Sequence, residues 1–200
     1  VSYVEPYASS TCEMVAEILQ YIVDKPKLKN IEADAMYSGI LVDTDNFVIK
    51  AGVRTFEAAA FLRRAGADVT RVRKMFREDM EHCRIRTAII NKAEIYMNEF
   101  AISTFDGVNV SGATVVGAKA ANALLNIQGI RGSFVLTSLQ DCIYISARSI
   151  DELNVQVIME KFNGGGHLTM AAAQLKNVTL EEAKQQLEDV LQQMREDGDI

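Results

Sequence analysis

The spacing of apolar residues changes near Asn98, and this change constrains the fold more than any other feature of the sequence. Before Asn98, apolar residues recur every three or four positions, as on one face of an α-helix. After it, Ser133–Leu139 and Cys142–Ala147 are typical of β-strands, with Gln140-Asp141 between them as a hairpin turn. The sequence therefore predicts a helical first part and a second part that mixes α and β structure.

Capping signals divide the first part into helices. Ser10 and Glu13 form a capping box ahead of an apolar helix face, and this helix is expected to end near Asp24. A second helix is expected from about Ile31 to Leu41 and leads into a polar turn. Thr55 is placed to cap a third helix.

The helical pattern then continues almost without interruption from Asp68 to about Asn98. Its middle, Arg77 to Arg86, is charged, which suits a solvated connector between two lobes. We expect residues 1–80 to form one lobe, residues 81–98 a helical connector, and residues 99–200 a second lobe. Because the second lobe interleaves strands with helices, the predicted fold class is α/β.

Helices and strands alternate in the second part. Phe100 to Phe105 alternates loosely, as a strand does. Helices are expected at about Thr114–Leu125, Asp151–Phe162 and Thr179–Arg195. The last of these begins with a second capping box, formed by Thr179 and Glu182.

Composition excludes several classes of protein. Hydrophobic residues make up 48% of the 200 residues, and no apolar run approaches the roughly 18 residues that suggest a membrane span. The net charge of −6 argues against binding of long nucleic acid, which needs a basic face, but it allows a small anion in a local pocket. The three scattered cysteines give neither a disulfide framework nor a zinc motif, so a reducing cytoplasm fits best.

The segment Asn163-Gly164-Gly165-Gly166-His167 is the clearest candidate for a binding site. Glycines let backbone N–H groups approach a ligand closely, and His167 can donate a hydrogen bond to a phosphate oxygen. The small residues of Leu168–Ala173 are expected to begin a helix, whose N-terminus would favour phosphate. The alternative is a helix C-cap followed by an ordinary loop.

Weaker signals come from an arginine and from two acids. Ser146, Arg148 and Ser149 end a predicted strand, where a guanidinium and two hydroxyls can converge on a phosphate; the alternative is a surface arginine. Asp43 and Asp45 lie in a turn from which carboxylates can reach a divalent cation; the alternative is a solvated turn. His82, in the charged stretch, is expected to face solvent.

Several of these motifs together resemble the DHH phosphoesterase family. The second-lobe motifs resemble the DHH-associated domain, and the first-lobe motifs resemble the C-terminal part of the DHH catalytic domain. The amino-acid sequences of these motifs are most similar to those of the GdpP-type cyclic-di-AMP phosphodiesterases of Gram-positive bacteria. The segments that carry the resemblance are Glu5-Pro6-Tyr7-Ala8-Ser9-Ser10-Thr11, Gly39-Ile40-Leu41-Val42-Asp43-Thr44-Asp45-Asn46-Phe47, Arg54-Thr55-Phe56-Glu57-Ala58-Ala59, Ile145-Ser146-Ala147-Arg148-Ser149, Asn154-Val155-Gln156 and Gly164-Gly165-Gly166-His167-Leu168-Thr169-Met170-Ala171-Ala172.

The resemblance implies a mechanism. In that family two manganese ions activate a water that opens cyclic di-AMP to linear pApA. Asp43 matches the last metal-binding aspartate of the family. Ser146, Arg148, Ser149 and the loop from Gly164 to His167 match its substrate-binding positions. The family also implies a cytoplasmic domain in a membrane-anchored bacterial protein, with the membrane region outside this sequence.

The sequence departs from the family in one important way. It contains no Asp-His-His triplet and begins at Val1 without an initiator methionine, so we expect a piece of a longer enzyme that binds nucleotide but does not hydrolyse it. Alternatives are a DHH-type oligoribonuclease or nucleotide phosphatase, and a nucleotide-binding or oligomerisation module without chemistry. A homodimer is also expected, because the first helix can expose an apolar face.

Overall fold

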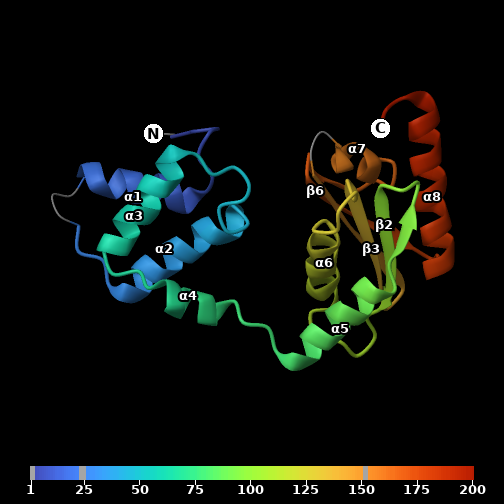
Figure 1. Ribbon diagram of the computed structural model, residues 1–200, viewed down its shortest axis with the longest axis horizontal. Helices are drawn as coiled ribbons and strands as arrows, with labels where there is room; N and C mark the ends of the chain where they lie inside the picture. Colours follow the sequence, from blue (N-terminus) through green and yellow to red (C-terminus); the bar gives the residue numbers. More distant parts are fainter. Residues whose placement is uncertain (1–2, 23–25, 151–152) are drawn as a thin grey trace. The chain divides into compact units, whose positions relative to one another are not determined.

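The computed structural model describes residues 3–22, 26–150 and 153–200. The chain forms two compact units, Val1–Arg77 and Glu78–Ile200, which the colours of Figure 1 separate into blue to teal and green to red. The predicted helix end at Asp24 and the predicted helix start at Asp151 lie outside the described residues. Within the described ranges, no helix has both the length and the apolar character needed to cross a membrane.

The first unit is helical in its described part. Ser10 caps the first helix, because its hydroxyl accepts the Glu13 N–H at 3.1 Å. The predicted capping box is only half formed, since the Glu13 carboxylate accepts the N–H of Ser9, at 3.2 Å, and not that of Ser10. Gly39 allows the first two helices to approach closely, since a β-carbon there would collide with Cys12 Sγ. The core contains Ile40 and Leu62, both fully buried. The helices are α1 (Thr11–Ile22), α2 (Asn30–Asp43), α3 (Val53–Arg64) and α4 (Val69–Met75).

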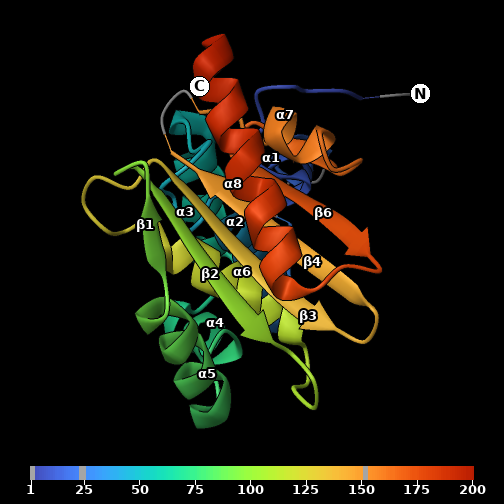
Figure 2. The same ribbon diagram turned by 90° about the vertical axis from the view of Figure 1, so that its right-hand side faces the viewer.

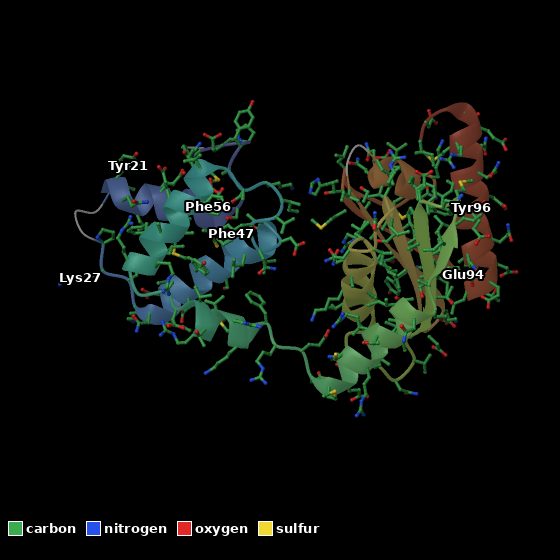
Figure 3. The ribbon with its side chains drawn as sticks, viewed as in Figure 1. Tyr21, Lys27, Phe47, Phe56, Glu94 and Tyr96 are labelled. Atoms are coloured by element: carbon green, nitrogen blue, oxygen red, sulfur yellow. The ribbon has the colours of Figure 1, made fainter. Side chains whose placement is uncertain are left out.

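Aromatic rings close one end of this core. Phe47 follows α2 and stacks on Phe56 of α3, with ring centroids 5.1 Å apart (Figure 3). The edge of Tyr37 packs against Phe47 at 6.2 Å. Such contacts fix the turn after α2, which contains the three left-handed residues Asp45, Asn46 and Phe47.

The single long helix predicted from Asp68 to Asn98 is wrong. Two aspartates each start a separate helix: Asp68 accepts the Arg71 N–H and Asp79 accepts the His82 N–H, both at 2.8 Å. The helix that starts after Asp68 is α4. The helix that starts after Asp79 is α5 (Met80–Asn91), which packs within the second unit. The predicted connector therefore consists of a helix of the second unit followed by a short strand.

The second unit mixes helices and strands, as the sequence predicts, and it is built on one sheet with parallel and antiparallel neighbours. The strand order is β1-β2-β3-β4-β6-β5, with β2 and β3 parallel and the other neighbours antiparallel. The predicted turn at Gln140 and Asp141 joins β3 to β4, with Gln140 in the left-handed region at φ 57°. The strands are β1 (Glu94–Tyr96), β2 (Phe100–Asp106), β3 (Gly132–Leu139), β4 (Cys142–Ser149), β5 (Gly165–His167) and β6 (Met170–Lys176).

Helices cover both faces of this sheet. One face packs on α8, which crosses it in Figure 2, and on α7, and its core includes Phe134 and Leu187. The opposite face packs on α5 and α6, and Ser133 of β3 donates to Ala121 O of α6 at 2.7 Å. The bounds of these helices are α6 (Ala113–Leu124), α7 (Val155–Glu160) and α8 (Leu180–Asp197).

Side chains of β1 fasten α8 to the edge of the sheet. Lys184 forms an ion pair with Glu94 at 2.7 Å, and the Tyr96 hydroxyl donates to Glu188 O at 3.3 Å (Figure 3). The capping box predicted for α8 is present: Thr179 Oγ1 accepts the Glu182 N–H, and the Glu182 carboxylate accepts the Thr179 N–H.

The helix predicted to begin in Leu168–Ala173 is also wrong. Met170–Lys176 form strand β6, and the Ala triplet alternates across it, with Ala171 and Ala173 buried and Ala172 exposed. Pairing with β4 outweighs the helix propensity of alanine. Consequently no helix N-terminus follows His167, and phosphate binding at this loop cannot rely on one.

Candidate functional site

The register of three strands places four of the predicted substrate-binding residues on one face of the sheet. Ser146 of β4 pairs with Ala172 of β6, which pairs with Gly165 of β5. Two residues along, Arg148 pairs with Met170, which pairs with His167. Paired residues of neighbouring strands point to the same side, and so do residues two apart on one strand. Ser146, Arg148, Gly165 and His167 therefore share a face, which is the one that carries α6.

A groove of about 450 Å³ lies on this face. Apart from Ile145, the lining residues carry hydroxyl, amide or very small side chains, and none of them is an acid, a lysine, an arginine or a histidine. The lining comprises Thr114, Tyr144, Ile145, Ser146, Asn163, Gly164, Gly165, Ala172, Ala173 and Gln174. The groove therefore suits an uncharged, hydrogen-bonding group.

Arg148 lies next to the groove and is half-buried. Its Nε donates to Asn122 Oδ1 of α6 at 2.7 Å, and its Nη1 donates to its neighbour Ala147 O at 2.8 Å. No ion pair joins it to an acid among the residues that the structure describes. Burial lowers the pKa of the guanidinium from its ordinary value, because removal from water disfavours the charged form. An anionic ligand would supply the missing charge partner.

The three glycines differ in what they do. A β-carbon on Gly164 would collide with Ala172 O, and one on Gly166 would collide with Met170 O. These two glycines let β5 lie close to β6, and Gly166 also adopts a φ of +156°. A β-carbon on Gly165 would meet no atom within 4 Å. The absence of a side chain at Gly165 thus keeps open space in the groove and is not needed for packing.

Asn163 ends the segment that follows α7. It adopts the left-handed conformation at φ 54°, and the N–H of Gly164 donates to Met159 O at 2.9 Å. Both features are typical of a helix C-terminus, so the alternative reading of this loop as a C-cap also describes it. His167 is exposed at the end of β5, which is an edge strand.

Ser149 is not brought to the shared face. Its side chain is buried, and its hydroxyl donates to Leu153 O at 2.7 Å and lies 3.2 Å from Leu168 O. Ser149 is one residue from Arg148 and therefore points to the opposite side of β4. Its contacts hold together the segments before α7 and before β6, and they leave no free donor for a ligand.

Asp43 stands alone as a candidate metal ligand. It is the last residue of α2 and is exposed, and Asp45 lies in the following turn with a positive φ of 44°. Across residues 3–22, 26–150 and 153–200, no group of three or more His, Cys, Asp or Glu side chains is arranged to hold a metal ion. The described residues therefore do not form the two-metal centre that the family resemblance implies.

His82 is less exposed than the sequence predicts. Its side chain is 30% exposed, its Nδ1 lies 2.8 Å from Asp79 Oδ2, and its Nε2 lies 3.0 Å from Ser111 O. These contacts join the start of α5 to the loop before α6, which is a structural role.

Four residues beside the groove were missed by sequence reasoning: Thr114, Asn122, Tyr144 and Gln174. Tyr144 lies two residues before Ser146, so the alternation of β4 was a usable signal for it. Gln174 depends on the register of β6 against β4, and the two α6 residues depend on how that helix crosses the sheet. Neither the strand register nor the position of α6 on the sheet follows from local sequence.

The fold and the glycine-rich strand pair define a known class of domain. Residues 100–196 match the family model of the DHHA1 domain. The matched residues lie within the second unit, which is therefore similar to the DHHA1 domain over most of its length. An exopolyphosphatase-related protein from Bacteroides fragilis has the same fold, with a TM-score of 0.88 at 21% identity over 97% of this chain and 59% of that chain.

The whole chain is also similar to named enzymes, as its motifs indicated. Cyclic-di-AMP phosphodiesterase PdeA of Listeria monocytogenes is 47% identical over 186 residues, which are 92% of this chain and 28% of PdeA. Cyclic-di-AMP phosphodiesterase GdpP of Geobacillus thermodenitrificans is 45% identical over 197 residues, 98% of this chain and 30% of GdpP. The chain thus spans less than a third of the length of these relatives.

Proposed function

We propose that this chain is the nucleotide-binding part of a phosphodiesterase that hydrolyses cyclic di-AMP to linear pApA. The identity of 45–47% to cyclic-di-AMP phosphodiesterases supports this substrate and reaction. The role of the second unit is to bind a phosphate of the dinucleotide at Arg148 and His167, beside the groove at Gly165.

The observation that carries the proposal is the position of Arg148. It is half-buried two residues along β4 from Ser146, which lines the uncharged groove, and no described acid pairs with it. A net charge of −6 makes non-specific attraction of an anion unfavourable, so binding must come from a local site. Asn122 orients the guanidinium through the bond to Nε, which leaves Nη2 available as a charge-assisted donor to a phosphate oxygen.

His167 supplies the second donor in this proposal. It lies in the same cross-strand row as Arg148, two strands away, at a spacing of roughly 10 Å between backbones. Two long side chains that reach inward from such positions can contact one phosphate or two neighbouring ones. Gly166 and Gly164 bring the β5 backbone close to β6 and so fix where His167 stands.

The metal requirement belongs to the longer protein. Divalent ions such as Mn²⁺ would lower the pKa of a bound water and neutralise charge on the phosphate. Asp43 is the residue of this chain that we propose as one ligand, and we propose that the other ligands lie in the part of the longer relatives that this chain does not span. The 200-residue chain is therefore expected to bind nucleotide without hydrolysing it.

Calorimetric titration tests the binding part of the proposal. The 200-residue chain is titrated with cyclic di-AMP and with pApA, with and without Mn²⁺, alongside Arg148→Ala and His167→Ala. We expect binding that does not require Mn²⁺ and that weakens by about tenfold or more in each variant, because a charge-assisted hydrogen bond is lost. Arg84→Ala, an exposed arginine of α5, is the matched control.

Unchanged affinity in Arg148→Ala would contradict the proposed site. To separate the substrate from short RNA, hydrolysis of both by the intact enzyme is compared; much faster cleavage of short RNA would contradict the assignment to cyclic di-AMP. Membrane anchoring of the intact protein and its origin in a Gram-positive bacterium stay predictions that rest on the family resemblance. Homodimer formation stays a prediction that rests on the apolar face of the first helix.

A further inference from the structure

A short stretch around α4 concentrates positive charge in a chain that is acidic as a whole. Residues 63–77 contain a single acid, Asp68, whereas the whole chain has a net charge of −6. A local excess of one sign attracts a partner that carries many charges of the opposite sign. The cations of this stretch are Arg63, Arg64, Arg71, Arg73, Lys74 and Arg77.

Two of these cations are used inside the first unit. Arg63 donates to Ala67 O, and Arg71 pairs with Asp34 at 2.6 Å. Val72, between them and the end of α4, is fully buried in the core of the unit. These contacts fix α4 on that core, so the residues at its C-terminal end have a defined place.

The cations at the C-terminal end of α4 are not used in this way. Among the residues that the structure describes, no acid forms an ion pair with Arg73, Lys74 or Arg77. The adjacent acid, Glu78, is occupied by Arg86 at 3.0 Å. The three cations are therefore open to a partner from outside the chain.

Two apolar side chains lie between these cations. Met75 is 56% exposed and Phe76 is 48% exposed. The Phe76 N–H donates to Arg73 O at 3.3 Å. The Arg77 N–H donates to Lys74 O at 3.4 Å, so the chain continues to turn where α4 ends. Residues 73–77, the docking segment, thus carry three cations and two apolar side chains on one exposed turn.

We propose that the docking segment binds a lipid surface that carries anionic headgroups. Its cations contact the headgroup phosphates, and Met75 and Phe76 enter the boundary between headgroups and acyl chains. The inference does not depend on the proposed function, because the docking segment belongs to the first unit and Arg148 to the second.

The mixture of side chains favours a lipid surface over a nucleic acid. Bases stack on aromatic rings, and Phe76 is the one aromatic residue of the docking segment. The thioether side chain of Met75 has no aromatic face, and it gains by leaving water for an acyl environment. Cations beside exposed apolar side chains are typical of segments that lie in a membrane interface.

Co-flotation of the 200-residue chain with lipid vesicles tests this docking. Vesicles of equal parts phosphatidylglycerol and phosphatidylcholine are compared with vesicles of phosphatidylcholine alone. We expect binding to the anionic vesicles that falls as salt is raised from about 0.1 M to about 1 M, because the Debye length shrinks from about 10 Å to about 3 Å. Hydrogen exchange of residues 73–77 should become slower when the vesicles bind.

A double variant measures the contribution of charge. Arg73→Gln combined with Lys74→Gln should weaken binding to the anionic vesicles by about 25-fold, since each cation near such a surface contributes roughly fivefold. Arg84→Gln combined with Lys92→Gln is the matched control. It removes the same charge from exposed positions on α5 and at its C-cap, and should leave binding nearly unchanged.

A second variant measures the apolar contribution. Phe76→Ser should weaken binding by about tenfold, and this loss should not depend on salt, because the burial of apolar surface is not screened. Val115→Ser, at a similarly exposed position of α6, is its control. Hydrogen exchange of core amides without vesicles reports whether each variant retains the fold.

Three outcomes would overturn the proposal. The first is equal binding to both kinds of vesicle, or full binding by the double variant of Arg73 and Lys74. The second is loss of vesicle binding in Arg148→Ala, which would place the lipid phosphate at the second unit. The third is an oligouridylate that binds and slows hydrogen exchange of residues 73–77 while anionic vesicles do not, because the partner would then be a nucleic acid.

Discussion

The two units bury their apolar residues in different ways. In the second unit, helices on both faces of a sheet bury large side chains such as Phe134 and Leu136 completely. In the first unit, small helices leave large apolar residues in water: Tyr21 is 90% exposed, Val53 77% and Ile22 74%. The second unit therefore contains a core that is complete within its own residues, whereas the first has a thinner one.

This difference predicts unequal responses to the loss of a buried side chain. Phe134→Ala should destabilise the second unit by about 4 kcal/mol, and Leu62→Ala should destabilise the first by about 3 kcal/mol, because each leaves a cavity in a packed core. Both side chains are fully buried, and the larger loss expected for Phe134 also reflects its larger side chain. Urea unfolding followed by hydrogen exchange at assigned amides would locate each loss.

Each variant should leave the amides of the other unit protected. If Phe134→Ala instead lowered protection in both units equally, the two would unfold as one cooperative body, and the comparison between them would have no thermodynamic meaning.

The same contrast between packing and open space exists within the glycine segment. Gly166→Ala should destabilise the second unit by about 2 kcal/mol, because a β-carbon collides with Met170 O and the φ of +156° is strained for alanine. Gly165→Ala should change stability by no more than about 0.5 kcal/mol. Thermal unfolding of the two variants measures the difference. Equal losses would show that the β5 backbone does not follow the described path.

Much of the fold of the second unit could be predicted, because its signals are local. The turn at Gln140-Asp141 and the capping box of Thr179 and Glu182 each depend on residues within a few positions of one another. The stretch Leu168–Ala173 could not be predicted in this way. Its alanines favour a helix locally, and only pairing with β4 and β5, which are distant in sequence, makes it a strand.

The candidate site shows the same limit. Arg148 and the glycine segment are visible as motifs, whereas the side chains of the groove come from four separate segments. Gln174 reaches the groove through strand register, and Thr114 through the position of α6. Ser149 and Arg148 point to opposite sides of β4, because side chains alternate along a strand. A sequence motif that groups adjacent residues together does not predict this.

The smallest effect that we predict concerns the pH dependence of the first unit. Asp34 of α2 accepts the Arg71 Nε–H at 2.6 Å and the Asp68 N–H at 2.7 Å, and these contacts hold the pKa of its carboxyl below the ordinary value. A lowered folded pKa contributes stability that is fully present above the unfolded pKa, near 4, and is lost as the pH falls through the folded value.

The first unit should therefore lose stability as the pH falls below about 4, and Asp34→Asn should reduce this dependence. Hydrogen exchange of α2 and α4 amides across this range measures it, because Arg71 links those two helices. Asp141→Asn, in an exposed turn of the second unit, is the control and should leave the first unit unchanged. If Asp34→Asn retained the full acid dependence, the Asp34–Arg71 pair would not be its source, and another carboxylate such as Asp68, whose pKa is also lowered by its bond from the Arg71 N–H, would take that place.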